Sequence, residues 1–236
     1  MPSLISPKER GITKMDDRKI QILIDSLWPM IKAGLQFTIP LTLIAFALGL
    51  VLAIVVALVR LWKIPVLSQI AGIYVWIIRG TPLLVQLFII FYGLPTIGIK
   101  FDPFMAAIIG FTLNMGAYNS EIVRAAIQSI SKGQWEAAYS LGMTRGEALR
   151  RIVLPQATRV SVPPLSNSFI SLVKDTSLAY TITVVEMFQV SKQVSAVTYE
   201  PLLIYCEVAV LYLVLCTVLN ALQNVMEKRL ARFSTR

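Results

Sequence analysis

The chain has 236 residues, of which 56% are hydrophobic and only 15% are charged, and its mean hydropathy is +0.70. A soluble domain carries about 25% charged residues, so this composition excludes an ordinary soluble protein and predicts a multispan helical membrane protein. The net charge of +9 would suit a nucleic-acid-binding protein, but the basic residues lie at the ends of apolar runs, as expected for a membrane protein. We therefore expect no nucleic-acid partner.

The residue types that carry most enzyme chemistry are absent. The chain has no histidine, which excludes histidine-based catalysis and histidine metal sites. Cys206 and Cys216 lie ten residues apart on one apolar run, so they face different sides of a helix and cannot bridge within it. The chain also lacks the G-x-x-x-x-G-K-[ST] phosphate-binding loop. We expect no catalytic residue, no metal site and no cofactor bound by this chain.

Residues 1–30 predict a polar tail and a helix that could lie at the membrane interface, with Trp28 as its anchor. Residues 1–26 contain no apolar core followed by a small-residue cleavage site, so we expect no cleaved signal peptide. Residues 31–230 then predict a single transmembrane domain, and residues 231–236 predict a basic cytoplasmic tail.

The first predicted span has 27 uncharged residues between Lys32 and Arg60, which exceeds the about 20 residues needed to cross a bilayer. Small residues recur at every fourth position along it, and such a stripe lets another helix approach closely. We expect the stripe to pack within the subunit; the alternative is a contact between two subunits. Its members are Ala45, Gly49, Ala53 and Ala57.

The second predicted span, residues 65–95, is too long for one straight crossing, and we expect it to be broken. Thr81 precedes Pro82, and a residue before proline resists the helical conformation. Broken helices occur at membrane depth only where protein or water satisfies the freed backbone groups. Arg79 lies beside this break, and an intramembrane arginine indicates a functional site. The alternative is that its side chain snorkels to the membrane interface.

The third predicted span starts near Pro103 and carries no charge before Glu121. Asn114, Tyr118 and Glu121 are spaced so that they share one face of a helix. Polar residues at this depth usually face the interior of a bundle. We expect Glu121 to pair with Arg124, three positions further along the same helix.

The fourth predicted span has only 14 uncharged residues between Arg159 and Lys174, and these include two prolines. A run this short predicts a segment that is buried in protein and does not face lipid. Lys174 and Asp175 follow it directly, and we expect these opposite charges to form a gate or a structural pair; the alternative is a ligand site. The fifth predicted span begins at Pro201.

The distribution of basic residues favours an inward-facing C-terminus. Residues 132–159 carry five basic side chains against two acidic ones, and residues 60–63 and 226–236 are also basic. With five spans this places the N-terminus outside, although the net charge of +1 on residues 1–26 mildly opposes that orientation. The alternative is a sixth membrane-associated element near residues 20–30.

Residues 131–157 are a polar, basic loop between the third and fourth spans, and they predict two short helices. Ser131 with Gln134 has the spacing of a capping box, and so does Thr144 with Glu147. Each pair would place the start of one helix. The loop is therefore expected to be ordered.

A glycine and a proline predict where these two helices end. Gly142 can take the left-handed conformation of a helix C-terminus at little steric cost. Pro155 lacks an N–H group and clashes inside a helix, so we expect it to end the second helix. Two capped helices held at a fixed angle indicate a rigid docking element.

The loop contains a spaced set of small and apolar residues that begins with a glutamate: Glu136, Ala137, Ala138, Gly142, Ile152, Leu154 and Pro155. This pattern resembles the EAA motif of bacterial ABC-importer permeases, with every fixed position filled at its usual spacing. The resemblance implies that these residues couple the chain to an ATPase. Residues 79–95 and 154–179 are also similar to the polar-amino-acid permeases of this class, and most similar to cystine permeases.

The resemblance implies an all-α integral membrane fold with about five transmembrane helices, in the type I ABC importer (MetI-like) arrangement with a cytoplasmic coupling helix. It implies a second permease subunit, with a homodimer favoured, and an extracellular or periplasmic substrate-binding protein. Two further subunits would be ATPases, which bind the ATP. The chain would lie in the lipid bilayer of the bacterial cell membrane. Closure of the ATPases would push the loop and tilt the third and fourth spans.

The resemblance also directs attention to the polar residues of the broken spans as the substrate site. Ser168 stands where many amino-acid permeases of the family have a glutamate, so we expect a substrate with a neutral, polar or sulfur-bearing side chain, such as L-cystine. Arg79 would suit the α-carboxylate of that substrate. The expected substrate-binding residues are Arg79, Gly80, Thr81, Asn114, Asn167 and Ser168.

Other interpretations remain open. The same class of importer could carry arginine, glutamine or histidine. An ion-coupled secondary transporter would explain the broken second span, although the chain shows no inverted internal repeat. A purely structural membrane subunit would leave the polar residues of the spans without a role.

Overall fold

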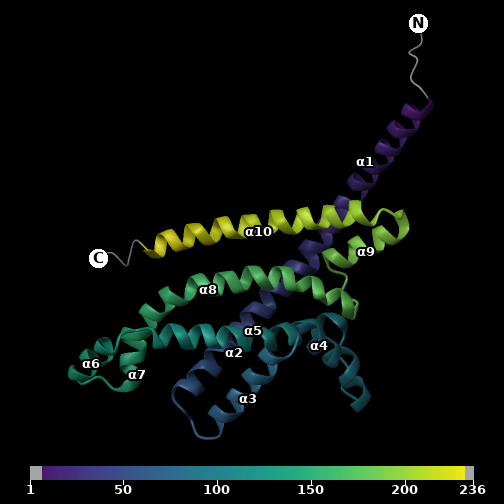
Figure 1. The fold of residues 1–236 in the computed structure, drawn as a ribbon. Coiled ribbons are helices and arrows are strands. Elements are labelled where there is room, and N and C mark those ends of the chain that lie inside the picture. Colours follow the sequence, from purple (N-terminus) through teal and green to yellow (C-terminus); the bar gives the residue numbers. More distant parts are fainter. Residues whose placement is uncertain (1–6, 232–236) are drawn as a thin grey trace.

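The computed structural model of the protein describes the backbone of residues 7–231 and the side chains of residues 16–228 (Figure 1). Every regular element of this part of the chain is helical. The elements are α1 (Pro7–Ala33), η1 (Gly34–Thr38), α2 (Ile39–Leu61), α3 (Leu67–Gly80), α4 (Leu83–Phe88), η2 (Ile89–Gly93), η3 (Leu94–Ile97), α5 (Pro103–Gln128), α6 (Lys132–Ser140), α7 (Arg145–Ala148), η4 (Leu149–Val153), α8 (Leu154–Asp175), η5 (Thr176–Ile182), α9 (Met187–Thr198) and α10 (Pro201–Ala231).

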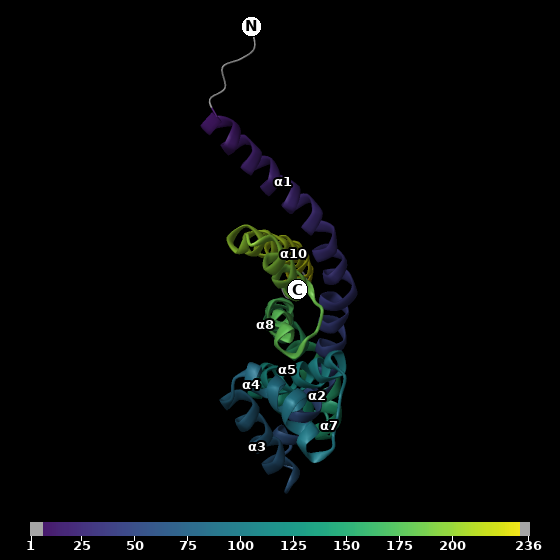
Figure 2. The same ribbon diagram turned by 90° about the vertical axis from the view of Figure 1, so that its right-hand side faces the viewer.

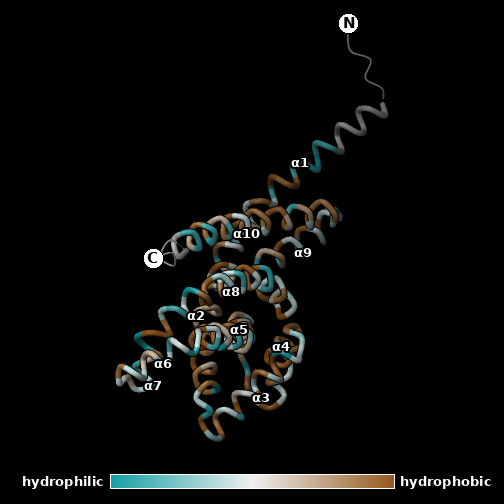
Figure 3. Tube along the Cα trace, turned by 60° about the vertical axis from the view of Figure 1, so that its left-hand side comes forward, coloured by the Kyte–Doolittle hydropathy of each residue, from teal (hydrophilic) through white to brown (hydrophobic). Residues whose placement is uncertain are grey.

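The N-terminal helix is longer than a bilayer is thick. Asp16–Leu61 runs as one helix of 46 residues through α1, η1 and α2. At about 1.5 Å per residue it spans about 69 Å, against about 30 Å of hydrocarbon. Its first part therefore extends beyond the other helices (Figures 1 and 2), and this part includes hydrophilic residues (Figure 3). The described part of the predicted polar tail is thus helical from Pro7, and residues 1–6 lie outside the described residues.

Three π-helical turns each precede a proline by two residues. The turns η1, η2 and η4 end at Thr38, Gly93 and Val153, and the prolines are Pro40, Pro95 and Pro155. Proline has no N–H group to donate and its ring crowds the carbonyl four residues earlier, and a locally wider turn accommodates it. The α-helix then continues past Pro40 and Pro155, whereas Pro95 lies in a short 3-10 helix that ends at Ile97.

The wider turn before Pro155 corrects the prediction that this proline ends the second helix of the loop. Pro155 does not end the second helix of the loop, because α7, η4 and α8 follow one another without a gap from Arg145 to Asp175. The predicted break in the second span is confirmed. The helix ends at Gly80, Thr81 is extended at φ −122° and ψ 145°, and the two halves meet at 107°.

Within the described residues, two helices are long and apolar enough to cross a membrane, or three if the bent pair is one span. They are the N-terminal helix and Pro201–Lys228, and the bent pair is Leu67–Gly80 with Leu83–Ile97. The helices α5 and α8 contain 26 and 22 residues and lie side by side, but they are more polar. Helices that line a polar cavity need not be apolar on every side. The total of about five spans stays a prediction.

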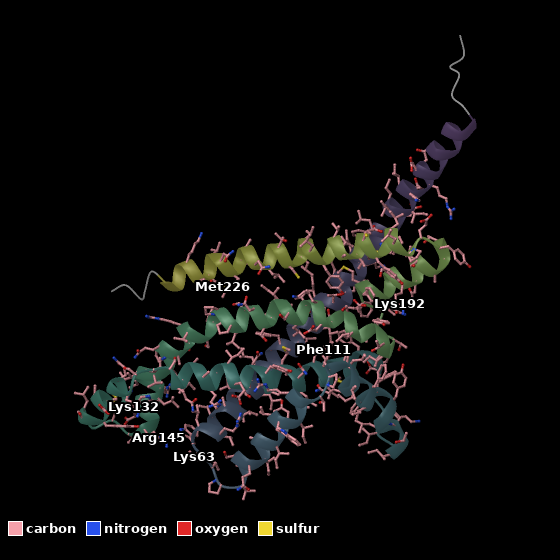
Figure 4. The ribbon with its side chains drawn as sticks, viewed as in Figure 1. Lys63, Phe111, Lys132, Arg145, Lys192 and Met226 are labelled. Atoms are coloured by element: carbon pink, nitrogen blue, oxygen red, sulfur yellow. The ribbon has the colours of Figure 1, made fainter. Side chains whose placement is uncertain are left out.

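Small residues allow α2 and α5 to pack at close range in the centre of the bundle. Ala45, Gly49, Ala53 and Ala57 are all buried, so the stripe packs within the subunit as predicted. A Cβ atom on Gly49 would lie 2.6 Å from Met115 Cβ of α5. The main core forms around this contact and includes the fully buried Phe111, Leu41, Leu87 and Leu172 (Figure 4).

Basic side chains gather at one end of the molecule. Lys63, Lys132 and Arg145 lie at this end, whereas Lys192 lies at the other (Figure 4). Arg145 Nη2 donates to the carbonyl oxygen of Leu61, 3.4 Å away, which links α7 to the end of α2. The start of α1 lies at the opposite end (Figure 1), in agreement with an outward-facing N-terminus under the positive-inside rule.

We expect Gly49→Ala to destabilise the protein, because the new Cβ atom would displace Met115 and overpacking costs about 1–3 kcal/mol. The midpoint of thermal unfolding should fall. The matched control is Gly72→Ala on α3, where a Cβ atom meets nothing within 4 Å. A midpoint for Gly49→Ala equal to that of the control would contradict this packing of α2 on α5.

Candidate functional site

A cavity of about 740 Å³ lies between the broken second span, α5 and α8. One wall of the cavity is formed at the break by Arg79, Thr81 and Pro82, and one face each of α5 and α8 forms the other walls. Polar and charged side chains alternate with apolar ones along its walls. The lining residues of the two helices are Asn114, Met115, Tyr118, Glu121, Ile122, Ala125, Pro164, Asn167, Ser168, Ser171 and Asp175.

A buried glutamine holds the break in the second span together. Pro82 has no N–H group for the carbonyl of Ile78, and Gln86 Nε2 takes its place by donating to that oxygen at 2.8 Å. The same amide donates to the carbonyl of Thr81 at 3.1 Å and to its Oγ1 at 2.9 Å. Asn114 Nδ2 of α5 in turn donates to Gln86 Oε1 at 3.1 Å. This network satisfies the backbone groups that the break exposes and fixes it to α5.

Arg79 projects from the last turn of α3 and lies over the ring of Tyr118, with its guanidinium carbon 5.3 Å from the ring centroid. This cation–π contact places the guanidinium between two cavities, because Arg79 lines the main cavity and a neighbouring one of about 540 Å³. Gly80 lines only the neighbouring cavity. Arg79 is an exposed side chain that lines both cavities, and its role in substrate binding stays a prediction.

An ion-pair cluster centres on Glu121, which lines both cavities. The carboxylate of Glu121 accepts hydrogen bonds from two arginines. Arg60 of α2 donates to Oε1, and Arg124 donates to Oε2 through Nη2 at 2.5 Å and Nε at 3.1 Å. The predicted pair with Arg124 is confirmed, and Arg60 is a second partner from another helix. The carboxylate of Glu121 is thus already neutralised by two guanidinium groups.

The structure brings five of the six predicted substrate residues into the main cavity, and Gly80 is the exception. Several of their polar groups are already engaged. Thr81 Oγ1 donates to the carbonyl of Ile77 at 2.9 Å, and Ser168 Oγ donates to Asn119 Oδ1 at 2.6 Å. Asn167 Oδ1 accepts from Gln223 Nε2 of α10 at 3.0 Å. Among the hydrogen bonds of the described residues, none engages the guanidinium of Arg79, the Nδ2 group of Asn167 or the Oδ1 atom of Asn114.

Lys174 and Asp175 occupy different surroundings. Asp175 is half-buried and lines the main cavity, whereas Lys174 is exposed and does not. Among the described residues, the two ion pairs both involve Glu121, so Lys174 and Asp175 form none with each other. A gating role for them stays a prediction.

The basic loop forms the short helices α6 and α7. The predicted capping box at Thr144 and Glu147 is confirmed, and the two bonds from Thr144 hold the pKa of the Glu147 carboxyl below its usual value. The other capping box is wrong, because the Ser131 side chain makes no capping bond to α6. Ser131 is still the N-cap residue of α6, so the predicted start is correct, but the Oε1 atom of Gln134 accepts from Gln156 Nε2 at 3.2 Å.

Gly142 ends α6 in the predicted way. Its φ is +79°, its N–H donates to the carbonyl of Tyr139, and the N–H of Met143 donates to that of Ala138. This pair of bonds is a Schellman motif, which needs a left-handed residue at its centre. Nothing lies within 4 Å of the position of an added Cβ atom, so the backbone angle alone requires glycine.

Apolar packing fixes the loop to the spans. Ala126 and Ile127 of α5 form one buried cluster with Leu149, Val153 and Ala157. In the same region Ala138 is buried and Ile152 and Leu154 are half-buried, whereas the outer surface carries the exposed Glu136, Ala137, Gly142 and Pro155.

Three residues that build the site are not among the predicted ones. Gln86 is a lone polar residue in an apolar run, which was a usable signal. Asn119 is fully buried on α5 and could have been included with its neighbour Tyr118. The role of Arg60 depends on the approach of α2 to α5, which no local pattern indicates.

The sequence matches the family described as "Binding-protein-dependent transport system inner membrane component" over residues 49–232. It is 51% identical to the L-cystine transport system permease protein TcyB of Bacillus subtilis (strain 168) over 209 residues, which cover 88% of this chain and 89% of that protein.

Two solved structures are similar in fold. A crystal structure of an amino acid ABC transporter with histidines has a TM-score of 0.79 and 32% identity, covering 91% of this chain and 97% of that chain. An inward-facing structure of the MetNI methionine ABC transporter has a TM-score of 0.74 at 20% identity, covering 86% and 97%. These matches confirm the predicted all-α type I importer arrangement.

We expect Gln86→Leu to destabilise the protein. It removes the partners of the Ile78 and Thr81 carbonyls and of the Asn114 amide, at a cost of about 1–3 kcal/mol for each group left unpaired. Thermal unfolding measures the effect. Gln69→Leu, at an exposed position of α3, is the matched control and should unfold near the wild-type temperature. Equal midpoints for the two variants would show that Gln86 does not hold the break.

Proposed function

This chain belongs to the family of binding-protein-dependent transport system inner membrane components and is an amino-acid permease of the ABC-importer type, and from that premise we propose that it translocates L-cystine. The observation that carries the proposal is the 51% identity, over most of both chains, to a permease of an L-cystine transport system.

The chemistry of the cavity supports this substrate. Arg79 offers a guanidinium group to an α-carboxylate, and such charge-assisted, bidentate pairing is a strong and directional form of carboxylate recognition. Ser168 and Ser171 make the α8 wall neutral at the middle of the cavity, while Met115 gives it an apolar, polarisable surface. A disulfide between two polar heads suits such a wall.

The transport cycle would draw its energy from another subunit. We place ATP binding and hydrolysis in two partner ATPases that dock on the loop 131–157, whose exposed surface is anchored to α5 and α8 by the cluster around Leu149 and Val153. A second permease subunit, identical to this one, and an extracellular or periplasmic substrate-binding protein would complete the importer. Its location would be the bacterial cell membrane.

A second candidate is another polar amino acid carried by the same class of importer. The observation in its favour is the similarity to an amino acid ABC transporter whose structure contains histidines. Arginine and glutamine belong to the same group of candidates. An ion-coupled transporter has no relative among these matches, although the bent pair of α3 and α4 first suggested one.

Uptake by cells that express the complete importer distinguishes these substrates. We expect excess unlabelled L-cystine to suppress uptake of radiolabelled L-cystine, and arginine, glutamine and histidine to compete at least about tenfold less well, as expected for an affinity difference of about 1.4 kcal/mol. Depletion of ATP should abolish uptake. If arginine, glutamine or histidine competes as well as L-cystine, that amino acid replaces L-cystine as the proposed substrate. Uptake that survives ATP depletion would favour an ion-coupled mechanism.

The loop is tested by Gly142→Asp. A non-glycine residue in the left-handed region costs about 1–2 kcal/mol, so the Schellman motif that ends α6 should be lost. We expect uptake and substrate-stimulated ATP hydrolysis to fall at least about tenfold, a change equivalent to about 1.4 kcal/mol, while the amount of protein in the membrane stays the same. Glu136→Lys on the exposed surface of α6 should act similarly.

The matched control for the loop is Gly133→Asp, which introduces the same charge near the start of α6 at a position without a left-handed backbone. It should retain most of the uptake. Normal uptake by both Gly142→Asp and Glu136→Lys would contradict a coupling role for residues 131–157.

A further inference from the structure

One acidic side chain in the cavity has no partner among the described residues. One face of α8 lines the cavity, because its lining residues recur three or four positions apart. These residues include Pro164, Ser168, Ser171 and Asp175. The other cavity carboxylate, Glu121, is held by two arginines, whereas no hydrogen bond or ion pair engages Asp175 within the described side chains. Asp175 is therefore the anionic group of this cavity that is available to a ligand.

Contacts between α5 and α8 give the relative heights of Asp175 and Arg79. Ser168 Oγ donates to Asn119 Oδ1 and lies 3.6 Å from Met115 Sδ, so Ser168 is level with residues 115–119 of α5. Tyr118 belongs to this part of α5, and the guanidinium of Arg79 lies over its ring. Asp175 is seven residues further along α8, which corresponds to about 10 Å at about 1.5 Å per residue. The cavity thus presents a cation and an anion at two separate levels.

This spacing fits a ligand with two amino-acid heads. The α-carbons joined through a disulfide lie about 4.4–6.8 Å apart. The ammonium nitrogen lies about 1.5 Å from its α-carbon and the carboxylate oxygens lie further out. With charge-assisted hydrogen bonds of about 2.8 Å at both ends, such a molecule can therefore join groups that are about 10 Å or more apart. An amino acid with one head and a short side chain, such as S-methyl-L-cysteine, cannot place charged groups at both levels.

We propose that Asp175 binds the ammonium group of one half of L-cystine while Arg79 binds the carboxylate of the other half. This inference rests on the proposed function and assigns the second half of its substrate to a named residue. Asp175 would then be a specificity-determining residue that selects the disulfide-linked dimer over single amino acids. Lys174, its neighbour, is exposed and does not line the cavity, but its positive charge acts on the Asp175 carboxyl without forming an ion pair.

Equilibrium binding to the purified permease–ATPase complex in nanodiscs tests the proposal. Radiolabelled L-cystine is the probe, and S-methyl-L-cysteine, which keeps one head and the sulfur, is the competitor. We expect Asp175→Asn to weaken L-cystine binding about tenfold or more, as for the loss of one charged hydrogen bond, and to change S-methyl-L-cysteine binding less than about twofold. Arg79→Gln should weaken the binding of both ligands.

The matched control is Asp25→Asn, which makes the same change at an exposed position of α1 far from the cavity residues and should leave both affinities as in the wild type. Equal weakening of both ligands by Asp175→Asn, or no weakening of either, would overturn the role of Asp175. If the wild-type complex binds arginine or glutamine in preference to L-cystine, it is the proposed substrate that fails. The two failures are therefore distinguishable.

Discussion

The exposed backbone of the broken second span is the constraint on which the candidate site depends. A break at membrane depth frees polar groups that no lipid can satisfy, and each unsatisfied group costs about 1–3 kcal/mol. Here Gln86 donates to the two carbonyls around Pro82 and also accepts from Asn114. Because that partner belongs to α5, the break is stable only where α5 lies. Arg79, in the last turn before the break, lies at the cavity wall over Tyr118.

Prolines have different effects elsewhere in the chain. Pro29, Pro163 and Pro164 lie inside α1 and α8 with no π-turn directly before them. Just upstream of Pro40, Pro95 and Pro155 the helix widens into a π-turn, and it then continues as an α-helix past Pro40 and Pro155 and as a short 3-10 helix past Pro95. At Pro82 it does not widen, and the chain turns by 107°. The difference lies in what surrounds the proline. A buried amide replaces the missing donor at Pro82, so an extended residue costs little there.

The same two helices carry the cavity and the basic loop. α5 and α8 supply most of the polar cavity wall at their middle, and at their inner ends they share a buried cluster with Leu149 and Val153. A rigid-body movement of the loop must therefore move those walls. The ion pairs of Glu121 lie between the two regions and tie α5 to the end of α2 through Arg60. These features connect the exposed surface of α6 with the cavity that holds Arg79 and Asp175.

The sequence by itself determined the class, the order of the polar elements, and several local structures. Composition predicts a membrane protein, Thr81 before Pro82 predicts the break, and the spacing of Thr144 and Glu147 predicts the confirmed cap. These features depend on residues close together in the chain, so local patterns suffice. Tertiary structure decided the rest. Pro155 stays within a helix because the preceding turn widens, and Ser168 of α8 donates its hydroxyl proton to Asn119 of α5. The bond between Asn114 and Gln86 and the ion pair between Arg60 and Glu121 each join two different helices, and only packing reveals them.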